Sequence, residues 1–246
     1  VEVGILNGGS LFMWREFLGK DARIIGVDNN PNAKKMERHG FEVFIGDQSS
    51  TDFWEQFFAD VGSVDVLVDD GGHTNKQQIV TNEACLAHIN DGGMIITEDT
   101  HASYMRSFGN PSKYNFVNYA KHIADCIQTR NPYVRQRCGN TFADKVYAVT
   151  FYESIVCLRI DRRRCAHSKI VEAGFEHIEA QDFRHQDRLS VPSRIFEAIT
   201  AMVPHAGLRR WLRDGQARIN GKLLQLQLML ENMSMRNRFG SSRQNW

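Results

Sequence analysis

The first 110 residues alternate short apolar runs with amphipathic stretches. The apolar runs are rich in Val and Ile and are bounded by Gly, Asp or Asn, which is typical of strands buried in a parallel sheet. Such runs span residues 1–6, 23–27, 42–45, 64–68 and 94–97. Because strands that alternate with helices form repeated βα units, this pattern predicts a parallel sheet covered by helices.

The stretches between these strands repeat their apolar side chains at helical spacing. They predict helices around residues 11–18, 53–58, 77–89 and 116–127. Two of these helices carry clear apolar faces, which we expect to pack against the sheet. The expected faces are Leu11, Trp14, Phe17 and Leu18 in the first helix, and Phe53, Trp54, Phe57 and Phe58 in the second.

The pattern changes after about residue 144. Two β-rich runs, residues 146–151 and 154–160, flank the polar pair Tyr152 and Glu153, which predicts an antiparallel hairpin. With the five expected parallel strands, the hairpin completes a seven-stranded sheet. The sequence therefore predicts an α/β fold over residues 1–190, a Rossmann-like doubly wound sheet with a terminal antiparallel hairpin.

Residues 191–246 differ in charge from the rest of the chain. They hold nine Lys or Arg against three Asp or Glu, a net charge of +6, whereas residues 1–190 sum to −5. We expect a basic helical tail that packs on its own domain or on a part of the protein upstream of Val1, or that self-associates; a nucleic-acid patch is a weaker alternative. A stripe with the spacing of coiled coils and helix-packing faces supports this: Ile219, Leu223, Leu226, Leu230 and Met233.

The composition is that of a soluble globular domain, with 246 residues, 28.2 kDa, 42% hydrophobic and 24% charged residues. A formal net charge of +1 gives no overall attraction to nucleic acid or to an anionic membrane. The apolar runs are shorter than the roughly 18 residues of a membrane helix, and no signal peptide is recognisable. We therefore expect a cytoplasmic protein.

Five cysteines, an odd number without a C-x-x-C pair, predict reduced structural thiols. The first residue is Val and stands at the start of an expected core strand. We therefore expect that residues upstream of Val1 are missing.

A glycine-rich turn links the first predicted strand to the first predicted helix. Within residues 2–10, Gly4, Gly8 and Gly9 let the backbone turn tightly beside a ligand, and helix N–H groups there can face an anion. Asp28 closes the second strand about 20 residues on, where an acid commonly binds ribose hydroxyls. The spacing departs from G-x-G-x-x-G, which favours S-adenosylmethionine (SAM) over NAD; a plain loop is the alternative.

Asp47 and Gln48 follow the third predicted strand. They would lie on the same sheet edge as the glycine turn, from which they can reach an adenine ring. The alternative is that this segment caps the following helix, because Asp and Ser are natural N-caps.

Carboxylates gather after the fourth and fifth predicted strands. Residues 68–73 read Val-Asp-Asp-Gly-Gly-His, and residues 97–99 read Thr-Glu-Asp. Neighbouring parallel strands lie roughly 4.8 Å apart, so Asp70, Glu98 and Asp99 can converge at the strand carboxyl ends. Like charges gathered there need a cation, and oxygen ligands without thiolates favour Mg²⁺ over zinc. For each residue taken singly, a helix cap or a solvated loop is the alternative.

His73 lies three residues after Asp70, close enough to share this site. An imidazole titrates near neutral pH, which suits it to accept a proton beside a metal site; a structural histidine is the alternative. His101 and Tyr104 follow the second carboxylate pair and can line an acceptor pocket or lie in a surface loop.

Five segments together resemble one family: residues 2–10, 45–49, 69–73, 97–104 and 151–156. They look like class I SAM-dependent methyltransferases of the metal-dependent sugar O-methyltransferase type, which act on deoxysugars of macrolides and related glycosides. The resemblance covers about residues 1–160. Relatives often carry Ser where Gly72 stands and Thr where Ala102 stands, and the basic tail has no clear counterpart.

The resemblance implies a role for each candidate residue. The metal would be Mg²⁺, held by Asp70, Glu98 and Asp99, with His73 as the general base. The substrate would meet His101 and Tyr104. SAM would be bound by Glu2, Gly4, Asn7, Gly8, Ser10, Asp28, Asp47, Gln48 and Asp69.

The resemblance also implies a function, the metal-assisted transfer of a methyl group from SAM to a sugar hydroxyl of a small glycoside, as in antibiotic biosynthesis. We expect a small-molecule partner, neither nucleic acid nor membrane, and self-association as an option for the tail. One alternative is an NAD-dependent oxidoreductase on the same scaffold, which leaves the carboxylate cluster unexplained. Another is a non-catalytic, methyltransferase-like interaction module.

Overall fold

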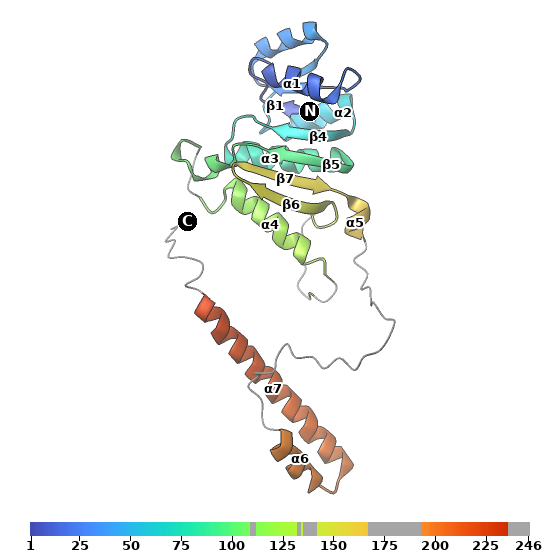
Figure 1. The fold of residues 1–246 in the computed structure, drawn as a ribbon, viewed down its shortest axis with the longest axis vertical. Coiled ribbons are helices and arrows are strands. Elements are labelled where there is room, and N and C mark those ends of the chain that lie inside the picture. The colour runs from blue at the N-terminus through green and yellow to red at the C-terminus, as the bar shows by residue number, and fades with distance from the viewer. Residues whose placement is uncertain (109–111, 132–133, 135–141, 167–192, 236–246) are drawn as a thin grey trace. The chain divides into compact units, whose positions relative to one another are not determined.

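The computed structural model describes residues 1–108, 112–131, 134, 142–166 and 193–235 (Figure 1). The chain divides into two compact units, Val1–Val171 and Glu172–Asn245. The boundary expected between residues 190 and 191 lies outside the described residues.

The first unit is built on one mixed sheet of seven strands. They are β1 (Glu2–Val3), β2 (Ile25–Asp28), β3 (Glu42–Ile45), β4 (Val64–Asp69), β5 (Ile89–Thr97), β6 (Val146–Tyr152) and β7 (Ile155–Ile160). Their order is β3-β2-β1-β4-β5-β7-β6; the first five run parallel, and β7 pairs antiparallel with both β5 and β6. The predicted doubly wound sheet with a terminal hairpin is confirmed.

Helices and short 3₁₀ segments connect the strands. They are α1 (Gly9–Leu18), η1 (Pro31–His39), α2 (Thr51–Val61), α3 (Asn75–Cys85), η2 (Leu86–His88), η3 (Thr100–Tyr104), η4 (Arg106–Phe108), α4 (Phe116–Gln128) and α5 (Arg162–Ala166). Local side chains fix where the helices begin, because they satisfy free N–H groups of the first turn. Ser50 caps α2, Asn115 caps α4, and Thr74 forms a capping box with Gln77 at α3.

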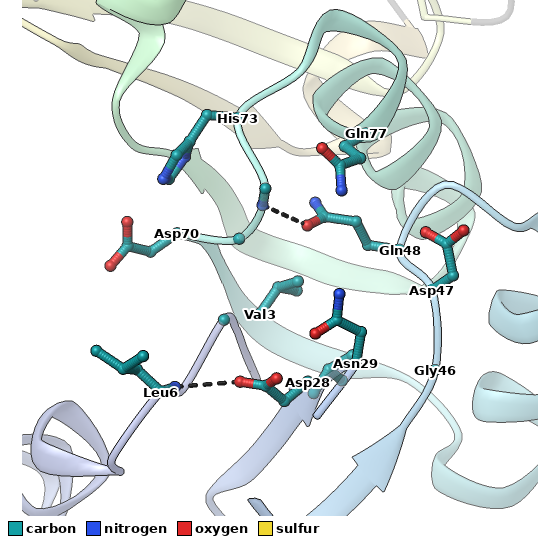
Figure 2. A pocket seen from close by; sticks show the side chains of 14 residues that line it. Val3, Leu6, Asp28, Asn29, Gly46, Asp47, Gln48, Asp70, His73 and Gln77 are labelled. Carbon is teal, nitrogen blue, oxygen red and sulfur yellow. Dashed lines mark hydrogen bonds between the residues drawn. The ribbon is translucent and has the colours of Figure 1, made fainter. Parts of the chain in front are cut away.

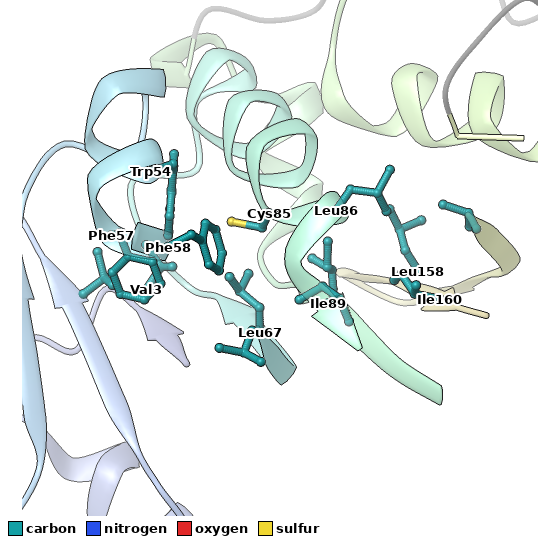
Figure 3. Packing of buried hydrophobic residues seen from close by; sticks show 14 of the residues in the cluster. Val3, Trp54, Phe57, Phe58, Leu67, Cys85, Leu86, Ile89, Leu158 and Ile160 are labelled. Carbon is teal, nitrogen blue, oxygen red and sulfur yellow. The ribbon is translucent and has the colours of Figure 1, made fainter. Parts of the chain in front are cut away.

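The larger apolar cluster packs α2 against the sheet. Trp54, Phe57 and Phe58 are buried there with Leu67 of β4 (Figure 3). Phe53 is partly buried against the same cluster, so the apolar face predicted for this helix is confirmed.

The smaller cluster packs α1 on the sheet, and here the predicted face is only partly right. Leu11 is fully buried and Trp14 packs against the cluster, but Phe17 and Leu18 are 76% and 55% exposed. Phe17 is six residues beyond Leu11, which at 3.6 residues per turn places it about 240° around the helix. Leu18 is the last residue of the helix.

The strand that carries Glu98 and Asp99 at its end begins earlier than expected. The predicted helix over residues 77–89 ends at Cys85, a 3₁₀ turn follows, and β5 starts at Ile89 in place of residue 94. Ile89 pairs with Val64 of β4, and the register then shifts before Val66 pairs with Met94. This irregularity breaks the apolar alternation, which is why the sequence pattern showed only the second half of the strand.

Cys85, Cys157 and Cys165 are free thiols. Cys126 is disulfide-bonded, so the expectation of reduced cysteines throughout is wrong for that residue. Cys138 lies outside the described residues.

The second unit contains α6 (Ser193–Ala201) and α7 (Ala206–Met235), which contact each other. Of the predicted stripe on α7, Leu223 is partly buried, whereas Ile219, Leu226, Leu230 and Met233 are about half exposed or more. Among the described residues, no helix is long and apolar enough to cross a membrane.

Candidate active site

The loops after β1 to β4 enclose a cavity of about 390 Å³ at the carboxyl ends of the strands (Figure 2). This is the sheet edge at which ligands of open α/β folds bind. The lining residues are Val3, Gly4, Leu6, Val27, Asp28, Asn29, Gly46, Asp47, Gln48, Asp70, Gly71, Gly72, His73 and Gln77.

Gly4 lets the glycine turn lie directly on the end of β4. Its φ of +84° is a conformation that side-chain-bearing residues rarely adopt. A Cβ atom at this position would come within 2.2 Å of the Asp70 carbonyl oxygen. A glycine is therefore required here for the first loop to reach the loop that carries Asp70.

Asp28 holds the glycine turn through its carboxylate. Oδ2 accepts hydrogen bonds from the backbone N–H groups of Ile5 and Leu6, both at 3.1 Å, and Oδ1 accepts one from Asn30 at 2.8 Å. Figure 2 shows the bond from Leu6. A carboxylate oxygen can accept about two hydrogen bonds. One position on Oδ1 therefore remains for a ligand.

Asp47 and Gln48 both line the cavity, but their side chains differ in what they bind. The Asp47 carboxylate accepts hydrogen bonds from the N–H and the hydroxyl of Ser49, and Ser50 caps the helix, so capping is not the role of Asp47. Gln48 is 6% exposed, and its amide bonds to Asp69, Gly72 and Thr81 within the protein.

Several residues expected to bind the cofactor do not line the cavity. Asn7, Gly8 and Ser10 lie in the turn and the start of α1. Glu2 is buried, and its burial raises its pKa, with the Ser10 and Trp14 side chains acting in the opposite direction. Asp69 is 1% exposed, and burial raises its pKa to about 6. Glu2 and Asp69 are thus buried and do not line the cavity, and a contact of either with the cofactor stays a prediction.

The predicted metal site is partly reorganised. One candidate ligand atom from each of Asp70, His73 and Asp99 lies within 4.8 Å of the other two. His73 Nε2 is 3.5 Å from Asp99 Oδ2, and His101 Nδ1 is 3.8 Å from Asp99 Oδ1. Glu98 is not in this close group, and His73 takes the third position that the sequence assigned to Glu98.

Glu98 nevertheless interacts electrostatically with Asp70 and Asp99 of this group. Burial first, and then the charges of Asp70 and Asp99, raise its pKa. Burial also raises the pKa of Asp70, with the Asp99 charge acting in the same direction and His73 opposing it. These carboxyl groups are thus crowded and partly desolvated, and no described residue donates a hydrogen bond to the carboxylate of Asp70 or Glu98. This is an arrangement that a bound cation stabilises.

Two of the four non-glycine residues with positive φ in the described part of the chain, Leu6 and His73, line the cavity; the other two are Asp99 and Ser154. Ser154 lies in the β6–β7 turn, where its carbonyl accepts a hydrogen bond from the Thr100 N–H at 3.0 Å. Backbone strain of this kind concentrates at functional sites, where the surrounding structure enforces it.

His101 and Tyr104 lie on η3, and both side chains are about half exposed. Sequence reasoning missed Leu6, Asn29 and Gln77 as cavity-lining residues. For Asn29 a signal existed, since it directly follows Asp28 at a strand end. For Gln77 the sequence indicated no role other than helix capping.

Residues 1–100 match the family model described as a methyltransferase domain. This match covers 100 of the 246 residues of the chain. The resemblance inferred from the motifs is thereby confirmed, and the oxidoreductase alternative loses its support.

Curated relatives match half of this chain or less. Demethylmacrocin O-methyltransferase of Streptomyces fradiae is 30% identical over 127 residues, which are 50% of this chain and 32% of the relative. Mycinamicin VI 2''-O-methyltransferase of Micromonospora griseorubida is 30% identical over 103 residues, 42% of this chain and 25% of the relative. The chain thus aligns with a third or less of the length of these relatives.

A solved structure supports the fold. The MycE methyltransferase from the mycinamycin biosynthetic pathway, in complex with Mg and SAH, superposes with a TM-score of 0.59 at 24% identity, covering 74% of this chain and 47% of MycE. A further MycE structure also contains mycinamycin VI.

Proposed function

We propose that this protein transfers a methyl group from SAM to a hydroxyl oxygen on the sugar of a small glycoside, with a divalent cation in the site. The observation that carries the proposal is the continuity of the cavity, which runs from the glycine turn and Asp28 to Asp70 and His73. A cofactor bound at one end would meet a second reactant at the other. The O-methyltransferase activities in the names of the relatives support the same chemistry.

The residues present fit a SAM-type cofactor. The free position on Asp28 Oδ1 suits a ribose hydroxyl, and Gly4 and Gly46 leave backbone in contact with the cavity. Asp47 lies on the same loop as Gly46, where it can accept from an amino group. The cavity volume lies within the range of small-molecule sites.

The residues also fit Mg²⁺, because the cluster is rich in carboxylate oxygens and contains no thiolate. We assign the metal to Asp70, Asp99 and Glu98, and the acceptor proton to His73. The assignment favours oxygen over the imidazole nitrogen of the close group, since Mg²⁺ prefers hard oxygen ligands. Measuring Mn²⁺ affinity in Glu98→Ala and His73→Ala separates the two arrangements, because a ligand substitution weakens binding and a base substitution does not.

When bound, SAM supplies a methyl group on positively charged sulfur, and the cation orients and acidifies the acceptor hydroxyl. The residues of this chain provide alignment and proton transfer. His73 in its neutral form would accept the hydroxyl proton, so that the oxygen could take the methyl group from SAM, whose sulfur would leave as a neutral thioether. Asp99 Oδ2, 3.5 Å from Nε2, stabilises the imidazolium that results. The rigid loop ends hold the two reactants in line.

The direct test is methyl transfer from labelled SAM to a panel of glycosides, with and without EDTA. Labelled product that disappears with EDTA supports the proposal. Full activity in EDTA removes the metal from it, and the absence of transfer to every glycoside, together with unmeasurable SAH binding by calorimetry, overturns it in favour of a non-catalytic module.

A further inference from the structure

The loop from Asp70 to His73 joins β4 to α3 and carries both a proposed metal ligand and the proposed base. Gln48 reaches this loop from the neighbouring β3–α2 connection (Figure 2). Its Oε1 accepts a hydrogen bond from the Gly72 N–H at 2.8 Å. The connection that lines the cofactor end of the cavity is therefore bonded directly to the middle of the loop at the other end.

Gln48 is itself held on several sides. Its side-chain Nε2 donates hydrogen bonds to Asp69 Oδ1 at 2.8 Å and to Thr81 Oγ1 at 3.1 Å. Its backbone carbonyl oxygen accepts a hydrogen bond from Trp54 Nε1 at 2.9 Å. These partners belong to β4, α3 and α2, and Gln48, Asp69, Thr81 and Trp54 are all buried. Both donors of the amide are used within the protein, so no N–H of this side chain remains for an adenine ring.

The backbone of the loop is shaped to this amide. A Cβ atom at Gly71 would come within 2.0 Å of Gln48 Oε1, so the loop lies against the amide without an intervening side chain. His73, at the end of the loop, has a φ of +58°. A non-glycine residue keeps this conformation only where neighbouring contacts enforce it.

We propose that Gln48 is a positioning residue for the metal and base loop, and not a cofactor contact. Gln48 fixes the backbone at Gly72. Because Asp70 and His73 flank Gly72 in the sequence, this holds the proposed metal ligand and the proposed base in position. The inference rests on the proposed function, since it concerns the loop to which that function assigns metal binding and proton transfer.

The test substitutes Gln48→Met, which keeps the side-chain length and removes the hydrogen bonds. We expect hydrogen exchange at the Gly72 amide to become about tenfold faster, as loss of one buried hydrogen bond implies. Mn²⁺ affinity, measured by calorimetry as a probe of the metal site, should also fall about tenfold. SAH affinity should change less than threefold, because the methionine side chain lines the cavity with a surface of a size similar to that of glutamine.

Thr81→Val is the matched control. It removes a hydrogen bond of the same buried amide but leaves the bond to Gly72, so Mn²⁺ affinity and Gly72 exchange should stay near those of the unaltered protein. Gln48→Asn, which keeps an amide too short to span Asp69 and Gly72, serves as the second variant if the Met variant does not fold, and should show the same losses.

A Gly72 amide that exchanges freely in the unaltered protein overturns the proposal. So does a Gln48 variant that loses SAH affinity while keeping Mn²⁺ affinity, since that is the behaviour of a cofactor contact. Failure of the unaltered protein to bind Mn²⁺ instead contradicts the metal in the proposed function, and the exchange measurement still decides the positioning role.

Discussion

The two ends of the cavity treat their carboxylates differently. At the cofactor end, Asp28 accepts three backbone hydrogen bonds and Asp47 accepts two from Ser49. At the acceptor end, Asp70 and Glu98 accept none from any described residue, and their pKa values are raised by burial and by neighbouring acids. A carboxylate that already accepts hydrogen bonds within the protein holds a loop in shape. Crowded carboxylates that accept no hydrogen bonds are stabilised by a bound cation instead. The number of acidic residues at a strand end does not distinguish structural carboxylates from cation-binding ones. Their hydrogen-bond partners do distinguish them.

The largest effect should come from the acceptor end. Asp70→Ala removes a metal ligand, so methyl transfer and Mn²⁺ binding should both be lost. The metal-free variant should unfold at the same temperature as the unaltered protein or higher, because the substitution also relieves repulsion with Glu98 and Asp99. Calorimetry and thermal unfolding without metal check both expectations. A strongly destabilised variant would show that Asp70 is a structural acid like those at the other end.

His73→Ala should reduce turnover by about 10²- to 10⁴-fold, the usual contribution of a positioned base. Mn²⁺ and SAH affinities should remain nearly unchanged, because the proposed role of His73 lies in proton transfer. His39→Ala is the control, because His39 is an exposed histidine on η1 that does not line the cavity. A loss of Mn²⁺ affinity on substitution of His73 would instead make it the third metal ligand.

At the cofactor end, Asp28→Ala should weaken SAH binding by roughly 10- to 100-fold, as loss of charge-assisted hydrogen bonds implies. It releases the N–H groups of Ile5 and Leu6, so the glycine turn should lose its shape as well. Calorimetry with SAH measures the effect, and Asp47→Ala, which frees only Ser49, should cost less. An unchanged affinity would show that the ribose binds elsewhere.

The raised pKa values of Asp70 and Glu98 set a pH dependence. In the metal-free protein the folded state holds these protons more tightly than the unfolded chain, so the stability they contribute is present at low pH and is lost as pH rises through the raised pKa. Mg²⁺ binds the deprotonated groups. The increase in Tm caused by Mg²⁺ should therefore be larger at about pH 8 than at about pH 5. An increase independent of pH would place the cation away from these groups.

The smallest effect on turnover should come from the second unit. The exposed stripe on α7 predicts self-association, so the double substitution Leu226→Asp and Leu230→Asp should lower the particle mass measured by light scattering. Methyl transfer per chain should be unchanged. Gln225→Asp, outside the stripe, is the control. An unaltered protein that is already monomeric would contradict the prediction.

The elements were predictable because their signals are local. Glycines after a strand, an acid at a strand end and alternating apolar residues depend on a few neighbours, and they indicated the sheet, the hairpin and the edge that holds the cavity. The directions of side chains were not predictable. Gln48 and Asp69 turn into the interior, where buried partners lie 21 to 33 residues away in sequence.

The metal site shows the same limit. The spacing placed Asp70, Glu98 and Asp99 at adjacent strand ends, but left-handed backbone at His73 and Asp99 brings the imidazole into the close group. No sequence pattern predicts a positive φ at a residue other than glycine.

The hydrogen bond from Thr100 to Ser154 has a consequence for how the protein is made. Ribosomes release the chain from its amino terminus, so every proposed ligand emerges before the β6–β7 turn does. Until that turn arrives, β5 lacks its β7 neighbour and the segment after Asp99 lacks its anchor. A nascent chain can thus build the cofactor end early, whereas the acceptor end becomes complete only when synthesis has passed β7.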